Sequence, residues 1–311
     1  MSQRPPPGAT PHLPRAFAFL MAAHIAFVLL DATGKSLATE MGVPLVSMIR
    51  HAGHALLMLA VLGPSMGLAL VRTAHPWLQL FRGLLLVGFT LSFFTALREL
   101  PQAEATAITF VTPFFVMLLA GPLLGETVTW RRWLGAAGGF LGMVLVIRPG
   151  ANLPALGVAF ALVTVACNIG FQLLTRRLAI TENSMTTIFL TSLVGITVSA
   201  ALLPLQQAWG GWPTALEPRH WALFAALGLF GAVSQWCLIR AYYWSSASFV
   251  APLVFVQIVW ATLSGTVFFG QWPDVISLAG MAFICVSGIG AMLADARAAR
   301  RVAAAAPRRP R

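Results

Sequence analysis

The chain has 311 residues, of which 58% are hydrophobic and only 9% are charged. A soluble domain carries roughly a quarter charged residues, so this composition excludes a soluble enzyme, a nucleic-acid-binding domain and a secreted disulfide scaffold. The mean hydropathy of +0.82 is typical of an integral membrane protein, and the chain has room for about eight to ten spans of about 20 residues each.

Ten apolar segments follow a Pro-rich tail at residues 1–14, which we expect to be a disordered cytoplasmic tail. The predicted transmembrane helices cover residues 15–35, 45–70, 78–98, 104–124, 131–148, 154–175, 183–205, 220–241, 247–270 and 274–294. The last stretch, 295–311, is rich in Ala and Arg and is predicted to be a basic cytoplasmic tail. The expected fold class is therefore an all-α integral membrane protein with ten transmembrane helices.

Basic residues are distributed unevenly between the two sides of these segments. With the N-terminus in the cytoplasm, fifteen of the 20 Lys and Arg residues fall in tails and cytoplasmic loops, Arg82 among them, and Arg50 lies within a segment. Four fall on the outer side, namely Lys35, Arg98, Arg148 and Arg219. This bias follows the positive-inside rule and predicts cytoplasmic N- and C-termini. The net charge of +11 is then an orientation signal whose partner is the lipid bilayer, and it requires no nucleic acid.

The sequence also repeats itself weakly. A gapless shift of 145 residues places Phe110 opposite Phe255 and Gly135 opposite Gly280, and the apolar segments and their breaks coincide as well. Five helices per half is an odd number, so the second half would enter the membrane from the opposite side. Inverted repeats of this kind build secondary transporters, which bind substrate between the repeats near the bilayer midplane. The predicted repeats are residues 15–150 and 151–294.

Several motifs give the chain a family resemblance. They are PLVSMIR at 44–50, ALRELP at 96–101, EATAITFVTP at 104–113, LGE at 124–126 and GGFLGMVLVIRPG at 138–150. With these motifs the chain resembles the ten-helix EamA-like family of the drug/metabolite transporter superfamily, from residue 16 to about 294. The resemblance implies two EamA-like five-helix repeats and a central cavity toward which Arg50 faces. It does not specify a substrate.

Ionisable residues inside predicted helices are costly and are functional candidates by default. Arg50 lies six residues past Pro44, about 9 Å inside the outer boundary at 1.5 Å per residue. It is a candidate for binding an anionic or carbonyl group, and a structural role with Asp31 or backbone carbonyls is the alternative. Asp31 and Lys35 share one face of the first helix at i and i+4, where they can pair or form a gate.

Further candidates are histidines and neutral polar side chains in the predicted helices. They are His54, His24, Asn168, Gln172, Gln235, Gln257 and Trp260. Histidine can change its charge near neutral pH, which would suit proton coupling. The alternative for each of these residues is a hydrogen bond that joins two helices.

Other features indicate structure rather than binding. The GxxxG spacings at Gly135–Gly139 and Gly138–Gly142 predict close helix packing. The family resemblance implies that this packing lies away from the cavity. Glu104 is expected near the hydrated outer interface, and Glu126 is expected to cap its helix or pair with a nearby arginine.

The function predicted from these features is secondary transport by alternating access, driven by a gradient or by exchange. The substrate is expected to be a small polar organic metabolite such as an amino acid, a vitamin or a related compound. The sequence has neither a nucleotide-binding loop nor a zinc signature, and its three cysteines are isolated, so no cofactor, metal or catalytic residue is expected. Protons or a counter-substrate are the expected coupling partners, and a homodimer remains open. The alternative is an integral membrane enzyme acting on a lipid-linked substrate through Arg50, His54 and Asp31.

Overall fold

The computed structural model describes residues 13–124, 130–148, 153–178, 181–209, 211–213, 215–244 and 253–305. Within these ranges the chain forms helices and no strand. The predicted roles of the N-terminal tail and of Glu126 fall outside the described residues.

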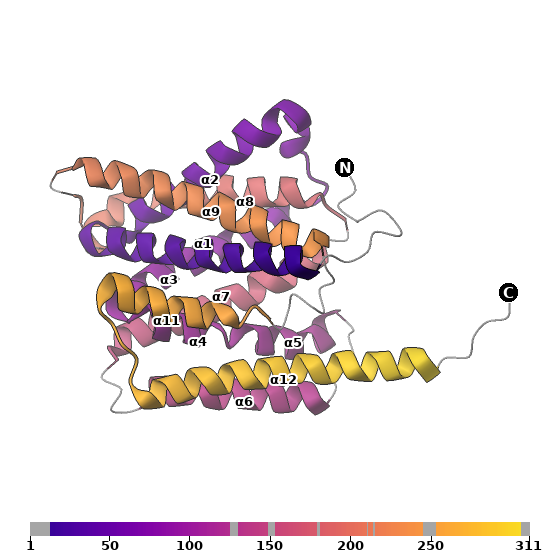
Figure 1. Cartoon of the computed structure of the whole chain (residues 1–311). Helices are drawn as coiled ribbons and strands as arrows, with labels where there is room; N and C mark the ends of the chain where they lie inside the picture. Colours follow the sequence, from indigo (N-terminus) through magenta and orange to yellow (C-terminus); the bar gives the residue numbers. More distant parts are fainter. Residues whose placement is uncertain are drawn as a thin grey trace.

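The helices pack side by side in a bundle, with α6 and α12 paired along one edge (Figure 1). Their bounds are α1 Leu13–Glu40, α2 Val43–Met66, η1 Gly67–Leu70, α3 Pro76–Glu99, α4 Gln102–Thr109, α5 Thr112–Leu124, α6 Trp130–Ile147, α7 Ala155–Leu178, α8 Ser184–Ala201, η2 Leu203–Trp209, α9 Pro218–Trp244, α11 Val256–Phe269 and α12 Val275–Ala305. Each predicted apolar segment corresponds to one of these helices or to a consecutive pair.

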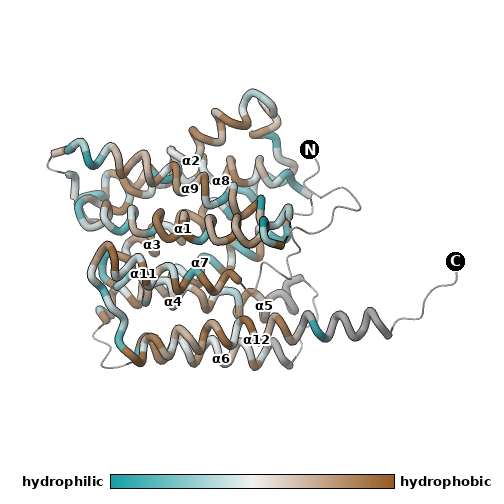
Figure 2. Tube along the Cα trace, in the orientation of Figure 1, coloured by the Kyte–Doolittle hydropathy of each residue, from teal (hydrophilic) through white to brown (hydrophobic). Residues whose placement is uncertain are grey.

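Among the residues that the structure describes, seven helices are long and apolar enough to cross a membrane, and α6 and α11 contain shorter apolar stretches. Hydrophobic residues dominate the lengths of the helices and hydrophilic ones gather at the corners (Figure 2). The sequence-based prediction of an all-helical membrane fold is therefore confirmed.

The fourth apolar segment consists of two helices, α4 and α5, rather than one. Pro113 has no N–H to donate, and its ring clashes with the carbonyl group four residues earlier, so it disfavours a continuous helix there. The chain turns instead at Phe110 and Val111, where the N–H of Val111 donates to the carbonyl of Ile108 at 3.3 Å. The break falls within an otherwise apolar run.

The ninth apolar segment is broken at the corresponding place. A turn at Val254 and Phe255 precedes α11, and the N–H of Ile258 donates to the carbonyl of Phe255 at 3.1 Å. The rings of Phe110 and Phe255 lie with their centroids 5.8 Å apart, so the two breaks meet inside the bundle. The start of α2 also coincides with that of α8 at a shift of 141 residues.

Two helices extend past the predicted segments. α1 continues to Glu40 rather than ending at residue 35, and α12 continues to Ala305, so part of the predicted tail is helical. Hydropathy measures compatibility with lipid, whereas Ala and Arg favour a helix in water as well. The extension of α12 therefore follows from helix propensity and not from membrane burial.

Close packing of α6 on α12 depends on glycine. A Cβ added to Gly142 would lie 2.7 Å from the carbonyl oxygen of Gly280, and one added to Gly138 would collide with Ser287. Small residues let membrane helices approach in this way. The prediction that the GxxxG residues serve packing is confirmed.

α2 and α9 also touch backbone to backbone. A Cβ on Gly53 would lie 2.8 Å from the Cα of Gly228. Because neither residue carries a side chain, the contact surface between these helices is smooth at this level.

Replacing Gly142 by Ala should destabilise the protein, because the added methyl group would lie within 3.0 Å of backbone atoms of Gly280 and Ile284 as well as 2.7 Å from the side chain of Ile284. Overpacking a tight contact costs about 1–3 kcal/mol. Gly290→Ala in α12 is the matched control, since a Cβ there meets no atom within 4 Å. Thermal unfolding in detergent should show a lower Tm for Gly142→Ala alone, and equal Tm values would contradict the packing.

Candidate functional site: a central cavity between the two halves

The two halves of the chain interleave instead of forming separate lobes. α1 packs on α9, α3 packs on α7 and α8, and α2 packs on α8 and α9. Between them lies a cavity of about 530 Å³, within the range of about 300–1,000 Å³ that small-molecule sites occupy. The lining residues that the structure describes come from α1–α5, α7–α9, α11 and the connecting turns, and none belongs to α6 or α12.

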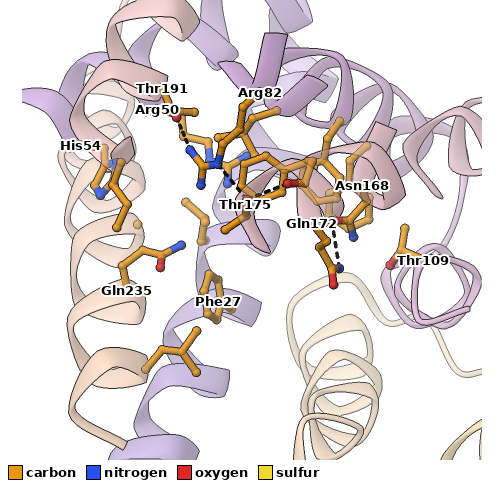
Figure 3. Close-up of a pocket in the computed structure, with 18 of the residues that line it drawn as sticks. Phe27, Arg50, His54, Arg82, Thr109, Asn168, Gln172, Thr175, Thr191 and Gln235 are labelled. Carbon is orange, nitrogen blue, oxygen red and sulfur yellow. Dashed lines mark hydrogen bonds between the residues drawn. The ribbon is translucent and has the colours of Figure 1, made fainter. Parts of the chain in front are cut away.

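The cavity has an apolar wall and a polar side. Five phenylalanines contribute to the wall, namely Phe27, Phe89, Phe93, Phe110 and Phe171. The polar lining residues are Asp31, Arg50, His51, His54, Arg82, Thr106, Thr109, Asn168, Gln172, Thr175, Glu182, Ser184, Thr187, Thr191, Ser192, Gln235 and Gln257. Figure 3 draws Arg50 and Arg82 at one end of the view, with Gln235 and Phe27 beside the space below them.

The cavity lining includes residues of the corner between α7 and α8, which lies at the end of the bundle where α1 begins and α12 ends (Figure 1). We name this end the terminal end. Glu182 and the exposed Ser184, at the corner between α7 and α8, line the mouth of the cavity. Glu182 accepts hydrogen bonds from the hydroxyl of Thr73 and from the N–H groups of Ala74 and His75. These bonds join the α7–α8 corner to the α2–α3 corner.

The other end, which we name the closed end, is held by hydrogen bonds between both halves. Nζ of Lys35 donates to the carbonyl of Leu100 at 2.6 Å and to Oε1 of Gln271 at 3.1 Å. The hydroxyl of Ser264 donates to Oε1 of Gln102 at 2.9 Å. The cavity lining does not include these residues.

The structure corrects two predictions at the closed end. Asp31 and Lys35 do not pair, because Lys35 binds Leu100 and Gln271 while Asp31 faces the cavity. Glu104 is only 4% exposed rather than hydrated at an interface, and its Oε2 has no hydrogen-bond partner among the described residues. Sequence position gives depth along a helix, but burial also depends on the neighbouring helices, and α4 packs on α11, α7 and α6.

Exposed ion pairs lie farther out. Arg219 binds Glu40 at 3.0 Å, and Arg148 binds Asp274 at 2.9 Å. The N–H of Ser277 and the guanidinium of Arg148 lower the pKa of Asp274, which lies just before α12. Exposed pairs of this kind contribute little stability because water and salt screen their attraction.

Arg50 and Asp31 face the cavity together. Nη1 of Arg50 donates to the hydroxyl of Thr90 at 3.0 Å, and the guanidinium carbon lies 5.6 Å from the ring centroid of Phe94. No described residue donates a hydrogen bond to the carboxylate of Asp31, which lines the same cavity as Arg50. The pair presents a cation and an anion to the contents of the cavity.

Arg82 is a cavity residue that the sequence analysis missed. It was counted among the loop residues in the charge bias, and that placement is wrong, because Arg82 lies inside α3 and is 4% exposed. The signal was present, since Arg82 falls within the predicted segment 78–98, where an ionisable residue is expensive. Without Arg82, most Lys and Arg residues are still assigned to the side of the two termini.

Side chains from α7 and α8 hold the Arg82 guanidinium. Nε donates to the hydroxyl of Thr175 at 2.7 Å, and Nη1 donates to the hydroxyl of Thr191 and to the carbonyl of Thr187. The guanidinium carbon lies 4.3 Å from the ring centroid of Phe171, a cation–π distance. Arg82 therefore has a fixed orientation at the cavity wall.

Seven of the ten predicted site residues line the cavity. They are Arg50, His54, Asp31, Asn168, Gln172, Gln235 and Gln257. Nδ1 of His54 shares a hydrogen bond of 3.0 Å with the hydroxyl of Ser192, and Nε2 of Gln172 donates to Oδ1 of Asn168 at 3.3 Å.

The other three predicted residues lie outside the cavity lining. Lys35 belongs to the closed end. His24 is 2% exposed in α1, and its Nδ1 finds no hydrogen-bond partner among the described residues. Trp260 lines a separate groove between α1 and α11.

The chemistry of the cavity suits binding of a polar organic molecule. It offers two guanidinium groups, one interior carboxylate, and several amides and hydroxyls against a phenylalanine wall. No group of three His, Cys, Asp or Glu side chains in the described part of the chain is placed to hold a metal ion.

A family comparison agrees with this geometry. The model of the EamA-like transporter family matches the chain twice, at residues 15–148 and 155–293. The chain belongs to the EamA-like transporter family. It is therefore a multi-pass membrane protein from a family of transporters, and the resemblance noted from the sequence is confirmed.

Curated relatives in this family are named as transporters of different molecules. The chain is 29% identical over 291 residues to a riboflavin transporter of Rhizobium johnstonii, covering 92% of this chain and 93% of that protein. It is 26% identical over 234 residues to an S-adenosylmethionine uptake transporter of Rickettsia conorii, covering 74% and 76%. It is also 26% identical over 224 residues to a pseudopaline exporter of Pseudomonas aeruginosa, covering 72% and 77%.

A solved crystal structure has the same fold. It superposes with a TM-score of 0.63 at 22% sequence identity, covering 92% of this chain and 99% of the other. At this level of identity the likeness concerns the fold alone.

Cysteine labelling should distinguish cavity positions from buried ones. In a background whose native cysteines are replaced by alanine, Gln172→Cys and Gln235→Cys should react readily with a water-soluble maleimide, because both positions line the cavity. His24→Cys is the control and should react much more slowly, since His24 is buried outside the lining. Equal reaction rates at all three positions, measured by mass spectrometry, would argue against a hydrated central cavity.

Proposed function

We propose that the protein is a secondary transporter that moves a small polar organic metabolite by alternating access. The observation that carries this proposal is the cavity between the two halves, whose lining reaches the exposed Ser184 at the terminal end, while hydrogen bonds of Lys35 link the halves at the closed end. In an alternating-access cycle, bonds such as those of Lys35 would break as the opposite end closes.

The architecture supports the same mechanism. We propose that residues 15–150 and 151–294 are inverted five-helix repeats, an arrangement that secondary transporters use to build two exchanging conformations. The backbone breaks at Phe110 and Phe255, which meet beside the cavity, support this proposal. Transporters commonly place such discontinuous helices at the substrate site.

The proposed substrate site consists of the polar residues that line the cavity. Arg50 and Asp31 would bind charged groups, while amides and a histidine would bind neutral ones. The neutral set is His54, Asn168, Gln172, Gln235 and Gln257. The relatives named for riboflavin, S-adenosylmethionine and pseudopaline support an amino acid, a vitamin or a related metabolite as the substrate class.

The proposal is tested by counterflow in proteoliposomes. Vesicles containing the purified protein and a high internal concentration of an unlabelled metabolite should accumulate the same metabolite in labelled form. A panel of amino acids, flavins and nucleosides covers the substrate classes. Counterflow of none of them would contradict the proposal, whereas chemical conversion of a lipid-linked compound would favour the alternative of a membrane enzyme.

Arg50 should govern substrate affinity rather than folding. Its one hydrogen bond to a described side chain, to Thr90, is of a kind that contributes on average about 0.6 kcal/mol inside membranes. Arg50→Gln should therefore keep the Tm in detergent nearly unchanged while weakening counterflow at least tenfold, or about 1.4 kcal/mol. Arg50→Lys should recover only part of the activity. It keeps the positive charge, but an ammonium group cannot reproduce the planar two-pronged contact with a carboxylate. Normal transport by Arg50→Gln, or its failure to fold, would assign Arg50 a structural role.

We also propose that both termini are cytoplasmic, so that the cavity of this structure faces the cytoplasm. Reporter fusions after Arg72, Arg177 and Arg311 should report the cytoplasm, because basic residues concentrate on that side. Fusions after Glu40 and Glu217 should report the opposite side. Inverted results at any two of these positions would overturn the orientation.

A further inference from the structure

Arg82 occupies the cavity wall without a countercharge. Its three hydrogen-bond partners, Thr175, Thr187 and Thr191, are all neutral. No described carboxylate forms an ion pair with it, and Nη2 has no acceptor among the described residues. An ionised group in an apolar environment is expensive unless it is paired. Arg82 therefore offers an unused charge and unused donors to a ligand.

A purely structural role explains only part of this arrangement. Arg82 joins α3 to α7 and α8, and a brace of that kind needs hydrogen bonds alone. Neutral threonines do not require a permanent cation as their partner, because a neutral amide can donate to them equally well. Gln79, one turn earlier on α3, does so by donating to the hydroxyl of Thr187 at 3.0 Å.

The two cavity arginines lie at different levels. Arg82 and Thr90 are eight residues apart on one face of α3, a separation of about 12 Å along the helix axis. Arg50 binds Thr90, so its guanidinium lies deeper than that of Arg82, which is nearer the start of α3 and the mouth. Leu86 and Phe89 line the cavity between these levels.

The deeper level also holds the interior carboxylate. Asp31 faces the cavity with no hydrogen-bond donor among the described residues. Gly34, one turn later on α1, packs against Phe94, the ring over which the Arg50 guanidinium lies. The mouth residue Glu182 accepts hydrogen bonds from Thr73 and from two N–H groups, and it forms no ion pair with Arg82. The interior therefore presents an anion and a cation at the deeper level, an apolar stretch, and a second cation nearer the mouth.

We propose that the cavity binds an organic molecule with an α-amino acid head group and a second, distal carboxylate, and that Arg82 binds the distal carboxylate. Asp31 would take the ammonium group and Arg50 the α-carboxylate, while the apolar stretch packs against Leu86 and Phe89. The ligand then has one positive and two negative charges, which complement the two cations and one anion of the interior. This inference rests on the proposed function, in which the cavity is the substrate site.

Three eight-carbon compounds test the charge pattern in the wild-type protein. L-2-aminosuberate has all three charged groups, L-2-aminooctanoate lacks the distal carboxylate, and suberate lacks the ammonium group. Isothermal titration calorimetry in nanodiscs should show aminosuberate binding at least tenfold more tightly than either of the others, or about 1.4 kcal/mol. Absence of that preference would overturn the inference.

Two variants assign the charges to residues. Arg82→Gln should abolish the preference for aminosuberate over aminooctanoate while keeping the preference over suberate. Asp31→Asn should abolish the preference for aminosuberate over suberate while keeping the preference over aminooctanoate. Arg219→Gln, which removes an exposed arginine far from the cavity lining, is the control and should retain both preferences. An equal loss of affinity for all three compounds in Arg82→Gln would show that Arg82 is only a brace.

A measurement on the wild-type protein covers the case in which Arg82→Gln does not fold. Phenylglyoxal modifies accessible guanidinium groups, and peptide mass spectrometry reads the modification at Arg82. Aminosuberate should protect Arg82 more strongly than aminooctanoate at equal occupancy, and equal protection would overturn the assignment.

Counterflow separates this inference from the proposed function. Binding of aminosuberate without counterflow of any metabolite would leave the inference standing and contradict transport. Counterflow of another metabolite without binding of aminosuberate would support transport and contradict the inference about Arg82.

Discussion

The cost of burying polar groups in an apolar environment governs this structure, because most of the buried polar side chains find their partners across the boundary between the two halves. Arg82 binds threonines of α7 and α8, Lys35 binds Gln271, and His54 binds Ser192. Polar burial therefore does two things at once. It joins the halves, and it concentrates the groups able to recognise a ligand along the seam between them.

The asymmetry between the two ends of the seam gives the structure one defined conformation. At the closed end, corners of both halves are linked through short side-chain contacts, as between Gln102 and Ser264. At the terminal end the corresponding space is the mouth of the cavity. α6 and α12 lie outside this asymmetry, because their glycine-mediated contact involves no cavity residue. They are suited to serve as a fixed support against which the other helices are arranged.

The sequence predicted the helices and much of the cavity lining, because hydropathy and the cost of intramembrane charge are local properties. It located Arg50 and Asp31 correctly in the cavity wall but misplaced Glu104 and Arg82. Both errors have one physical origin. Each residue lies within a turn or two of a helix start, so its position in the sequence predicts contact with water. In the structure, neighbouring helices pack over both side chains and exclude the water. The hydrogen bond between Lys35 and Gln271 could not be predicted either, because the two residues are 236 positions apart in the sequence and meet only through tertiary packing.

The contact of Gly53 with Gly228 bears on how fast α2 and α9 can move past each other. Helices whose side chains interlock must lift each ridge over the next before they slide, and each such step adds to an activation barrier. Two glycines present no ridge, so at this level the friction between α2 and α9 is low. We therefore expect a side chain at either position to hinder movement of α2 past α9 as well as to separate the two helices.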